Sequence, residues 1–395
     1  MKEFKLGKFL FNTFICSALH TSLISCILIP FFKSLSMIPI QISILVTVKR
    51  LVRLVGDTIF GLIFDRFGAK MVFLLGRFMK LISYFILFLD QSFLTLCIAM
   101  IIYGLSEGTI QGKVSSFIYN NLKANDKLSS FSRAMSMYYL VIDIHIAVMS
   151  FLAGILLKIY GYNLVIYVSI AINIFSIWLL IKLIPNNKKD DINSFQAKSI
   201  KDIFIKLKEV ISKNHLFLYL IVMYGVLVFF AWQFGSVASM ILLDMGMDGT
   251  GVATLGSVVK ICMAIGTLIP VFFYKNSLSL KAVMTNLFIL IFVGVVSATL
   301  YNIYLFCAFM LFVDLSYVIL EVSLEKNLEH FSDKTVRGTA ISLAITFSNA
   351  IAVIANLLVG IIAQYVNYRF ALCIILYTMF FVCFFALIKI KKYKL

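Results

Sequence analysis

The sequence predicts an all-α polytopic membrane protein with about twelve transmembrane helices, arranged as two pseudo-symmetric six-helix halves. Three observations predict this fold class. Of the 395 residues, 62% are hydrophobic and only 13% are charged, which is more apolar surface than a water-soluble protein covers. The apolar residues fall in long runs separated by short polar breaks. One long polar stretch divides these runs into two groups of six.

A helix needs about 20 consecutive apolar residues to cross a bilayer. The runs that meet this requirement predict helices over 9–30, 40–64, 71–89, 93–118, 134–159, 163–184, 215–243, 251–273, 282–300, 303–325, 338–365 and 370–390. In the third of these, Arg77 and Lys80 are the only charges. In the fourth, Gly104, Gly108 and Gly112 form a stripe of small residues that predicts close packing against another helix.

The polar stretch 185–214 predicts the domain boundaries. It begins at Pro185, and Ser199 with Asp202 three residues later resembles a helix N-terminal cap. In the residues that follow, apolar side chains recur at helical spacing on one face and lysines lie on the other. They predict either an amphipathic helix on the cytoplasmic leaflet or a solvated linker helix. We therefore expect an N-terminal half over 1–184, a linker over 185–214 and a C-terminal half over 215–395.

The two halves have related sequences. Gly154 and Tyr162 end the fifth predicted span, and Gly360 and Tyr368 end the eleventh at an offset of 206 residues. A weak internal repeat of this length is typical of transporters that are built from two six-helix halves.

The net charge of +17 is distributed asymmetrically along the predicted topology, which argues against nucleic-acid binding. One side has few charges: Lys33, Asp90, Asp244, Asp248 and Arg369. The other side has most of the cations: Lys2, Lys5, Lys8, Arg66, Lys70, Lys123, Lys127, Lys275, Lys281, Lys334, Arg337 and the tail from Lys389 to Lys394. Because positive charge favours the cytoplasmic side, we expect a multi-pass protein of the cytoplasmic (inner) membrane with both termini in the cytoplasm.

The segment from Gly61 to Lys70 is a charged break between two predicted helices. Gly61 predicts a close backbone approach at the end of the first helix. Gly68 predicts a turn residue with positive φ. Asp65, Arg66 and Lys70 lie at the helix ends, where they can pair with each other or with neighbouring helix termini.

This G-x-x-x-D-R-x-G-x-K pattern resembles the signature between the second and third helices of the major facilitator superfamily. One usual basic position of that signature is Ala69 in this chain. The resemblance implies the two-half fold and transport by alternating access. It also implies that Gly61, Asp65, Arg66, Gly68 and Lys70 act in the conformational change.

Four charges lie in the middle of predicted spans, where a charge costs about 2.5–3.5 kcal/mol. The offset of 207 residues relates Arg53 to Lys260 and Glu107 to Asp314. We therefore expect one ion pair per half, Arg53 with Glu107 and Lys260 with Asp314. These pairs either fix helix packing or line a central cavity.

Three further charges surround Arg53. Asp57 lies one turn later and is an alternative partner for it. Lys49 and Arg50 precede it, and they either extend towards the membrane surface or give the cavity a positive lining that attracts an anion.

Four more polar residues are candidates for substrate binding or coupling. Asp143 and His145 in the fifth span are either carriers of a coupling proton or a packed polar pair. Trp232 and Gln233 in the seventh span combine a flat apolar surface with a hydrogen-bonding group. They suit either a substrate lining or helix–helix contact.

The sequence has no P-loop and no hydrolase or metalloprotease motif, so we expect neither an enzyme nor a cofactor or metal site. The best interpretation is a secondary active transporter for a small anionic or zwitterionic solute, which works as a proton-coupled monomer. Its partners would be this solute, a coupling proton and membrane lipids. The alternatives are a multidrug–proton antiporter and, in another class, a non-transporting sensor or lipid-handling scaffold.

Overall fold

The structure is a computed structural model that describes residues 23–110, 113–114, 117–118, 131–183, 215–273, 280–299, 301–331 and 337–391. These residues form helices and, within these ranges, no strand. The predicted linker 185–214 and most of the first predicted span lie outside the described residues. Six of the described helices are long and apolar enough to cross a membrane, and three shorter apolar helices accompany them.

The chain divides into two compact units. Unit 1 comprises Met1–Ile192 with Met247–Ala264, and unit 2 comprises Asn193–Gly246 with Ile265–Leu395. The division near residue 192 falls inside the predicted linker. Residues 247–264, which follow the linker in sequence, have most of their contacts within unit 1. The predicted domain boundaries stay a prediction.

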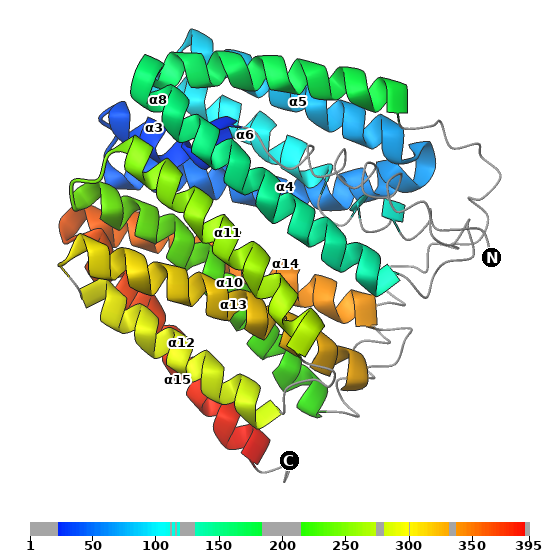
Figure 1. Cartoon of the computed structure of the whole chain (residues 1–395), viewed down its shortest axis with the longest axis vertical. Helices are drawn as coiled ribbons and strands as arrows, with labels where there is room; N and C mark the ends of the chain where they lie inside the picture. Colours follow the sequence, from blue (N-terminus) through cyan, green and yellow to red (C-terminus); the bar gives the residue numbers. More distant parts are fainter. Residues whose placement is uncertain are drawn as a thin grey trace. The chain divides into compact units, whose positions relative to one another are not determined.

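The described residues of unit 1 form six helices in chain order, together with the first part of α11 (Gly249–Phe273) (Figure 1). The six are α2 (Leu23–Cys26), α3 (Leu28–Ser34), α4 (Pro39–Phe67), α5 (Ala69–Leu89), α6 (Phe93–Gly108) and α8 (Phe131–Leu183). α8 contains the two predicted spans 134–159 and 163–184. Its only non-helical residue is Gly161, whose φ of 76° breaks the helix, and Figure 1 draws α8 as two arms.

The turn between α4 and α5 is a single residue. α4 begins at Pro39, whose fixed φ suits the first turn of a helix, and it continues to Phe67. Gly68 has a φ of 82°, as its place in the sequence predicts, and α5 begins at Ala69. The prediction of a close approach at Gly61 is wrong, because a Cβ atom there would meet nothing within 4 Å.

The close approach lies instead between α4 and α6. A Cβ atom on Gly104 would lie 2.4 Å from the Lys49 carbonyl oxygen, and one on Gly108 would lie 2.8 Å from the Asp57 nitrogen. The predicted small-residue packing is therefore confirmed at both positions, while Gly112 lies outside the described residues. Within the predicted span 93–118, α6 ends at Gly108, and residues 113–114 and 117–118 are again helical.

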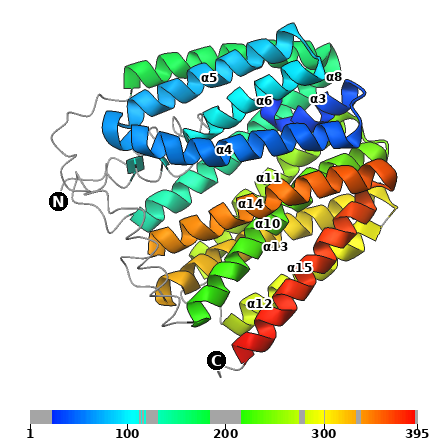
Figure 2. The same ribbon diagram turned by 180° about the vertical axis from the view of Figure 1, so that it is seen from behind.

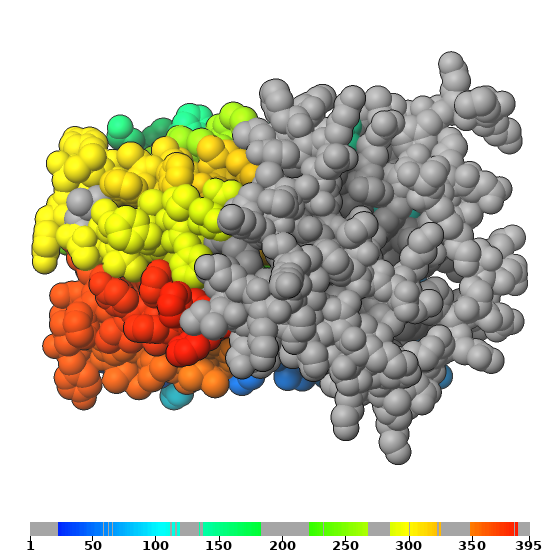
Figure 3. Space-filling model, turned by 90° about the horizontal axis from the view of Figure 1, so that it is seen from below, coloured from blue at the N-terminus to red at the C-terminus, as the bar shows by residue number. Residues whose placement is uncertain are grey.

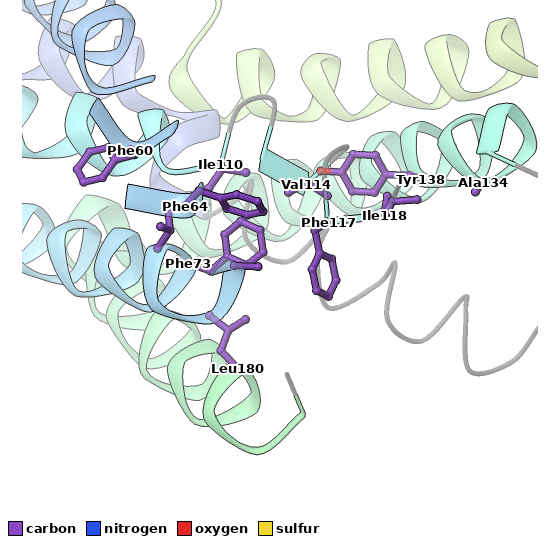
Figure 4. Packing of buried hydrophobic residues seen from close by; sticks show 12 residues of the cluster. Phe60, Phe64, Phe73, Ile110, Val114, Phe117, Ile118, Ala134, Tyr138 and Leu180 are labelled. Carbon is purple, nitrogen blue, oxygen red and sulfur yellow. The ribbon is translucent and has the colours of Figure 1, made fainter. Parts of the chain in front are cut away.

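An apolar cluster of unit 1 lies beside the α4–α5 turn (Figure 4). Phe64 and Phe73 hold the two sides of the turn together, with 6.3 Å between their ring centroids. Phe117 contacts Phe73 edge to face at 6.0 Å. Leu180 joins the cluster from α8. This packing fixes the direction of α4 and α5, and therefore the positions of the charges that they carry.

The described residues of unit 2 form α10 (His215–Asp244), the part of α11 from Ile265 onward, α12 (Leu280–Thr299), α13 (Ile303–Phe331), α14 (Arg337–Tyr365) and α15 (Tyr368–Lys391). α10 packs against α13, α14 and α15, and α12 packs against α13 and α15 (Figure 2). The space-filling view in Figure 3 shows α12 and α15 adjacent on the surface. Phe230 and Phe234 stack within the unit, with 5.5 Å between their centroids.

Candidate functional site

The candidate site is a group of charged side chains inside unit 1. Its cations come from two helices, Lys49, Arg50 and Arg53 from α4 and Arg77 and Lys80 from α5, and we call these five residues the basic cluster. Arg50, Arg77 and Lys80 are buried, while the side chains of Lys49 and Arg53 are about one-fifth exposed. The carboxylate that contacts the basic cluster is Glu107 of α6.

Glu107 lies between two of these cations. Its Oε1 is 3.4 Å from Lys49 Nζ, and its Oε2 is 3.7 Å from Arg53 Nη1. The predicted pair of Arg53 and Glu107 is therefore present, with Lys49 as an additional partner. Oε2 is buried and accepts no hydrogen bond from any described residue. The carboxylate is thus held by charge attraction at distances longer than those of a strong ion-pair hydrogen bond.

The local sequence explains why these groups meet. Lys49 and Arg53 are four residues apart, so they lie on the same face of α4. Gly104 and Gly108 flank Glu107 and let α6 contact the α4 backbone. The two glycines therefore bring Glu107 within reach of both cations.

Asp57, the alternative partner that the sequence offered for Arg53, also has a cation of its own. Its carboxylate forms an ion pair with Lys113, a residue that is 5% exposed. The Lys113 ammonium group also donates to the Asp57 carbonyl oxygen at 2.6 Å and to the Gly108 carbonyl oxygen at 3.0 Å. Lys113 thus has three acceptors, and it connects the end of α6 to α4.

Sequence reasoning missed Lys113, which lies close to the expected cytoplasmic end of a span, where lysines are common. The sequence feature that could have identified Lys113 is its position in an apolar segment, five residues after Gly108.

Arg77 and Lys80 were not among the predicted site residues, although both lie in the middle of a predicted span. Arg77 Nη1 donates to Asn173 Oδ1 at 3.0 Å, and Asn173 Nδ2 donates to the Arg77 carbonyl oxygen at 2.9 Å. This reciprocal contact anchors Arg77 to α8. Lys80 Nζ instead lies 5.1 Å from the centroid of the Tyr103 ring, and it donates no hydrogen bond to any described residue.

A second ion pair of unit 1 joins α8 to α11. Lys260 Nζ lies 3.2 Å from Asp143 Oδ1 and 3.3 Å from the Met263 sulfur. The expected pairing of Lys260 with Asp314 is therefore incorrect, since Lys260 has Asp143 as its partner. The repeat offset predicts equal depth in the membrane, but it does not determine which helices are neighbours.

The packing around this pair explains the partner. Ser150 of α8 donates from Oγ to the Ala253 carbonyl oxygen of α11 at 2.7 Å. Gly154 of α8 also lies close to Thr254, which a Cβ atom would contact at 3.1 Å. His145 is buried at 9% exposure on the same helix as Asp143. Residues two positions apart do not face each other on a helix, so His145 and Asp143 point in different directions.

The remaining candidates belong to unit 2 or to the α4–α5 turn. Asp314 and Gln233 are buried in unit 2, at 7% and 1% exposure, whereas the side chain of Trp232 lies outside those that the structure describes. At the turn, Lys70 Nζ donates to the Ile181 carbonyl oxygen in the last turn of α8 at 2.9 Å. A cation at a helix C-terminus is favourable, as expected for this position.

The signature segment has two further charged residues, Asp65 and Arg66. Arg66 is exposed and lies over the Phe67 ring, 5.3 Å from its centroid. The side chain of Asp65 lies outside those that the structure describes.

The chemistry of the basic cluster is that of an anion site. Lysine ammonium and arginine guanidinium groups donate charge-assisted hydrogen bonds to carboxylates and phosphates. Two of the five cations contact Glu107, and the other three lie buried on the same two helices. The cluster therefore concentrates positive charge beside the Glu107 carboxylate.

Comparisons with known proteins agree with this fold. Residues 10–320 match the model of the Major Facilitator Superfamily. An uncharacterized transporter of Buchnera aphidicola subsp. Schizaphis graminum (strain Sg) is 28% identical over 157 residues, which are 38% of this chain and 37% of that protein. The match thus spans little more than a third of that relative.

Solved transporter structures share the fold at low sequence identity. The structure of the nucleoside transporter NupG superposes with a TM-score of 0.71 at 13% identity, covering 97% of this chain and 98% of that chain. The POT family transporter PepTSo superposes with a TM-score of 0.69 at 14% identity, covering 98% and 97%. At these identities the likeness concerns the fold alone.

Proposed function

Because this chain belongs to the major facilitator superfamily and has the fold of its transporters, we propose that it is a secondary active transporter for a small anionic solute. It would move this solute across the cytoplasmic membrane by alternating access, as a proton-coupled monomer with both termini in the cytoplasm. The binding site would be the basic cluster with Glu107.

The observation that carries this proposal is the concentration of cations on α4 and α5 beside Glu107. Lys49 and Arg53 share this one carboxylate, and Arg50, Arg77 and Lys80 lie buried on the same two helices. Each charge in the bilayer interior costs about 2.5–3.5 kcal/mol on insertion scales. An anionic solute that binds between these helices would offset part of that cost, whereas a cationic drug would increase it.

Proton coupling is proposed for the pair of Asp143 and Lys260. Protonation of Asp143 would remove the charge that holds Lys260 at 3.2 Å and would loosen the contact between α8 and α11. A proton could in this way alter the relative stability of two conformations of the transporter. His145, two residues after Asp143 on α8, is the second candidate carrier.

The alternative functions require different arrangements of charge around these residues. A multidrug–proton antiporter would use a carboxylate without a cationic partner, and Asp143 was the candidate. Its ion pair with Lys260 favours the anion transporter. A sensor or lipid-handling scaffold would bind its ligand without moving it.

The test combines a binding screen with uptake. A ligand that binds the folded state raises its melting temperature, so a thermal-shift screen of anions, zwitterions and cationic drugs identifies the solute class. Uptake of the best ligand into proteoliposomes, with and without an imposed proton gradient, then separates the functions. Accumulation of an anion that depends on the gradient supports the proposal. Efflux of cationic drugs, or binding without uptake, contradicts it.

A further inference from the structure

Two buried lysines of unit 1 have opposite environments. Lys113 is 5% exposed, and its ammonium group has three oxygen acceptors from Asp57 and Gly108. Lys80 is 1% exposed, and its ammonium group donates no hydrogen bond to any described residue. The difference matters because a buried charge without hydrogen-bond acceptors is among the most costly groups in a folded protein.

The surroundings of Lys80 do not remove this cost. Its ammonium group lies over the Tyr103 ring, 5.1 Å from the centroid, and a cation–π contact at this distance compensates only part of the lost hydration. Arg77 lies three residues earlier on the same helix face and adds another positive charge. Among the described residues, Lys80 therefore has no hydrogen-bond acceptor of the kind that Lys113 has.

Tyr103 connects Lys80 to the part of the site that Glu107 occupies. The Lys49 ammonium group also lies 5.1 Å from the centroid of the Tyr103 ring. The two ammonium groups are therefore separated by no more than twice that length. Lys49 is about one-fifth exposed and contacts Glu107 at 3.4 Å, so it is the more accessible of the two lysines.

We propose that Lys80 and Lys49 bind the negative charges of the same solute, and that this solute carries two of them, as a phosphate group or a dicarboxylate does. This inference rests on the proposed anion transport and assigns its substrate class. One negative charge would satisfy Lys49 and Arg53 in the place of Glu107. A second negative charge supplies the acceptor that Lys80 lacks and extends the site to α5.

The proposal makes an unusual prediction about stability. If Lys80 serves to bind the solute, its charge destabilises the ligand-free protein. Lys80→Met should then raise the melting temperature of the purified full chain. The same substitution should weaken the binding of inorganic phosphate and succinate about 10- to 100-fold, the loss expected for one hydrogen bond between charged groups. Binding of acetate, which has one charge, should change much less. All three probes are compared at equal ionic strength by thermal shift and titration calorimetry.

Lys113→Met is the matched control, since it removes an equally buried lysine that has its acceptors. It should lower the melting temperature. A Lys80→Met variant that melts below the wild type or fails to fold, or that binds phosphate and succinate as tightly as the wild type, would overturn the inference. Lys80→Gln should give the same loss of dianion binding, which shows that the effect comes from the charge and not from the methionine side chain.

The experiment distinguishes failure of the proposed anion transport from failure of the role assigned to Lys80. If the wild type binds none of the three anions, the anion transport itself is wrong. If it binds them without dependence on Lys80, only the assignment of this lysine and of a dianionic substrate is wrong.

Discussion

The Glu107 carboxylate lies 3.7 Å from Arg53 Nη1 and 3.4 Å from Lys49 Nζ, so two cations one helical turn apart share a single anion. Both contacts are longer than the usual 2.7–2.9 Å of a charge-assisted hydrogen bond. A solute anion that approaches these cations more closely than Glu107 does would compete with it.

We expect Glu107→Gln to destabilise the ligand-free protein by about 1–3 kcal/mol, because it leaves two partly buried cations without their counter-charge. The double variant Arg53→Gln with Glu107→Gln should recover part of this loss. A double-mutant cycle of chemical unfolding measures the coupling. Strictly additive effects of the two substitutions would mean that the contact between Arg53 and Glu107 contributes nothing to the free energy of unfolding.

A second prediction concerns the packing of α6 on α4. Gly104→Ala would place a Cβ atom 2.4 Å from the Lys49 carbonyl oxygen, which is backbone and moves only with the helix. We expect a loss of about 1–3 kcal/mol from this overpacking, together with weaker anion binding, because Lys49 is displaced. Gly61→Ala is the control, since nothing lies within 4 Å of its Cβ position, and its melting temperature should not fall. Equal effects at the two glycines would contradict the observed packing.

The pair of Asp143 and Lys260 gives a third prediction. Asp143→Asn keeps the side chain's shape but cannot take up a coupling proton. We expect it to abolish accumulation driven by a proton gradient while exchange of labelled for unlabelled solute continues. Asp314→Asn, in unit 2, provides the comparison. Gradient-driven accumulation at the wild-type rate in Asp143→Asn would show that Asp143 does not carry the proton.

A fourth prediction concerns pH and the turn between α5 and α6, outside the membrane spans. Asp90 accepts hydrogen bonds from Thr95 Oγ1 at 2.6 Å and from the Ser92 backbone nitrogen at 3.0 Å, and these lower the pKa of Asp90 below its usual 3.8. Because the folded-state pKa is below the unfolded one, this carboxylate stabilises the fold above the unfolded value. The contribution is lost as the pH falls through the folded pKa.

Asp90→Asn should therefore lower the melting temperature at neutral pH, and the difference from the wild type should shrink as the pH falls below 3.8. Melting curves of both proteins across this range provide the measurement. A difference that stays constant with pH would mean that the ionised form of Asp90 has no special role.

Periodicity and composition were sufficient to predict most helices, because lipid requires long apolar runs and internally satisfied backbone groups. The break at Gly161 and the positive φ of Gly68 were also predictable, since only glycine adopts this conformation easily. The pair of Arg53 and Glu107 followed from matching depths in neighbouring spans.

The partner of Lys260 could not be predicted in the same way, since depth along a helix says nothing about which helix lies beside it. The end of α6 at Gly108 was hidden by the apolar residues that follow it. Lys80 was visible in the sequence, but its lack of an acceptor is a property of the packed structure. These three features depend on contacts between helices far apart in the sequence, and periodicity does not encode them.

The central claim is that the basic cluster binds the transported anion, and uptake into proteoliposomes tests it most directly. Arg53→Gln is compared with the wild type and with Lys182→Gln, which removes an exposed lysine that lies over the Trp178 ring near the end of α8. We predict that Arg53→Gln folds but loses most uptake of the anion that binds the wild type best, and that Lys182→Gln retains it. Uptake by Arg53→Gln at the wild-type rate and with the wild-type KM would contradict the account.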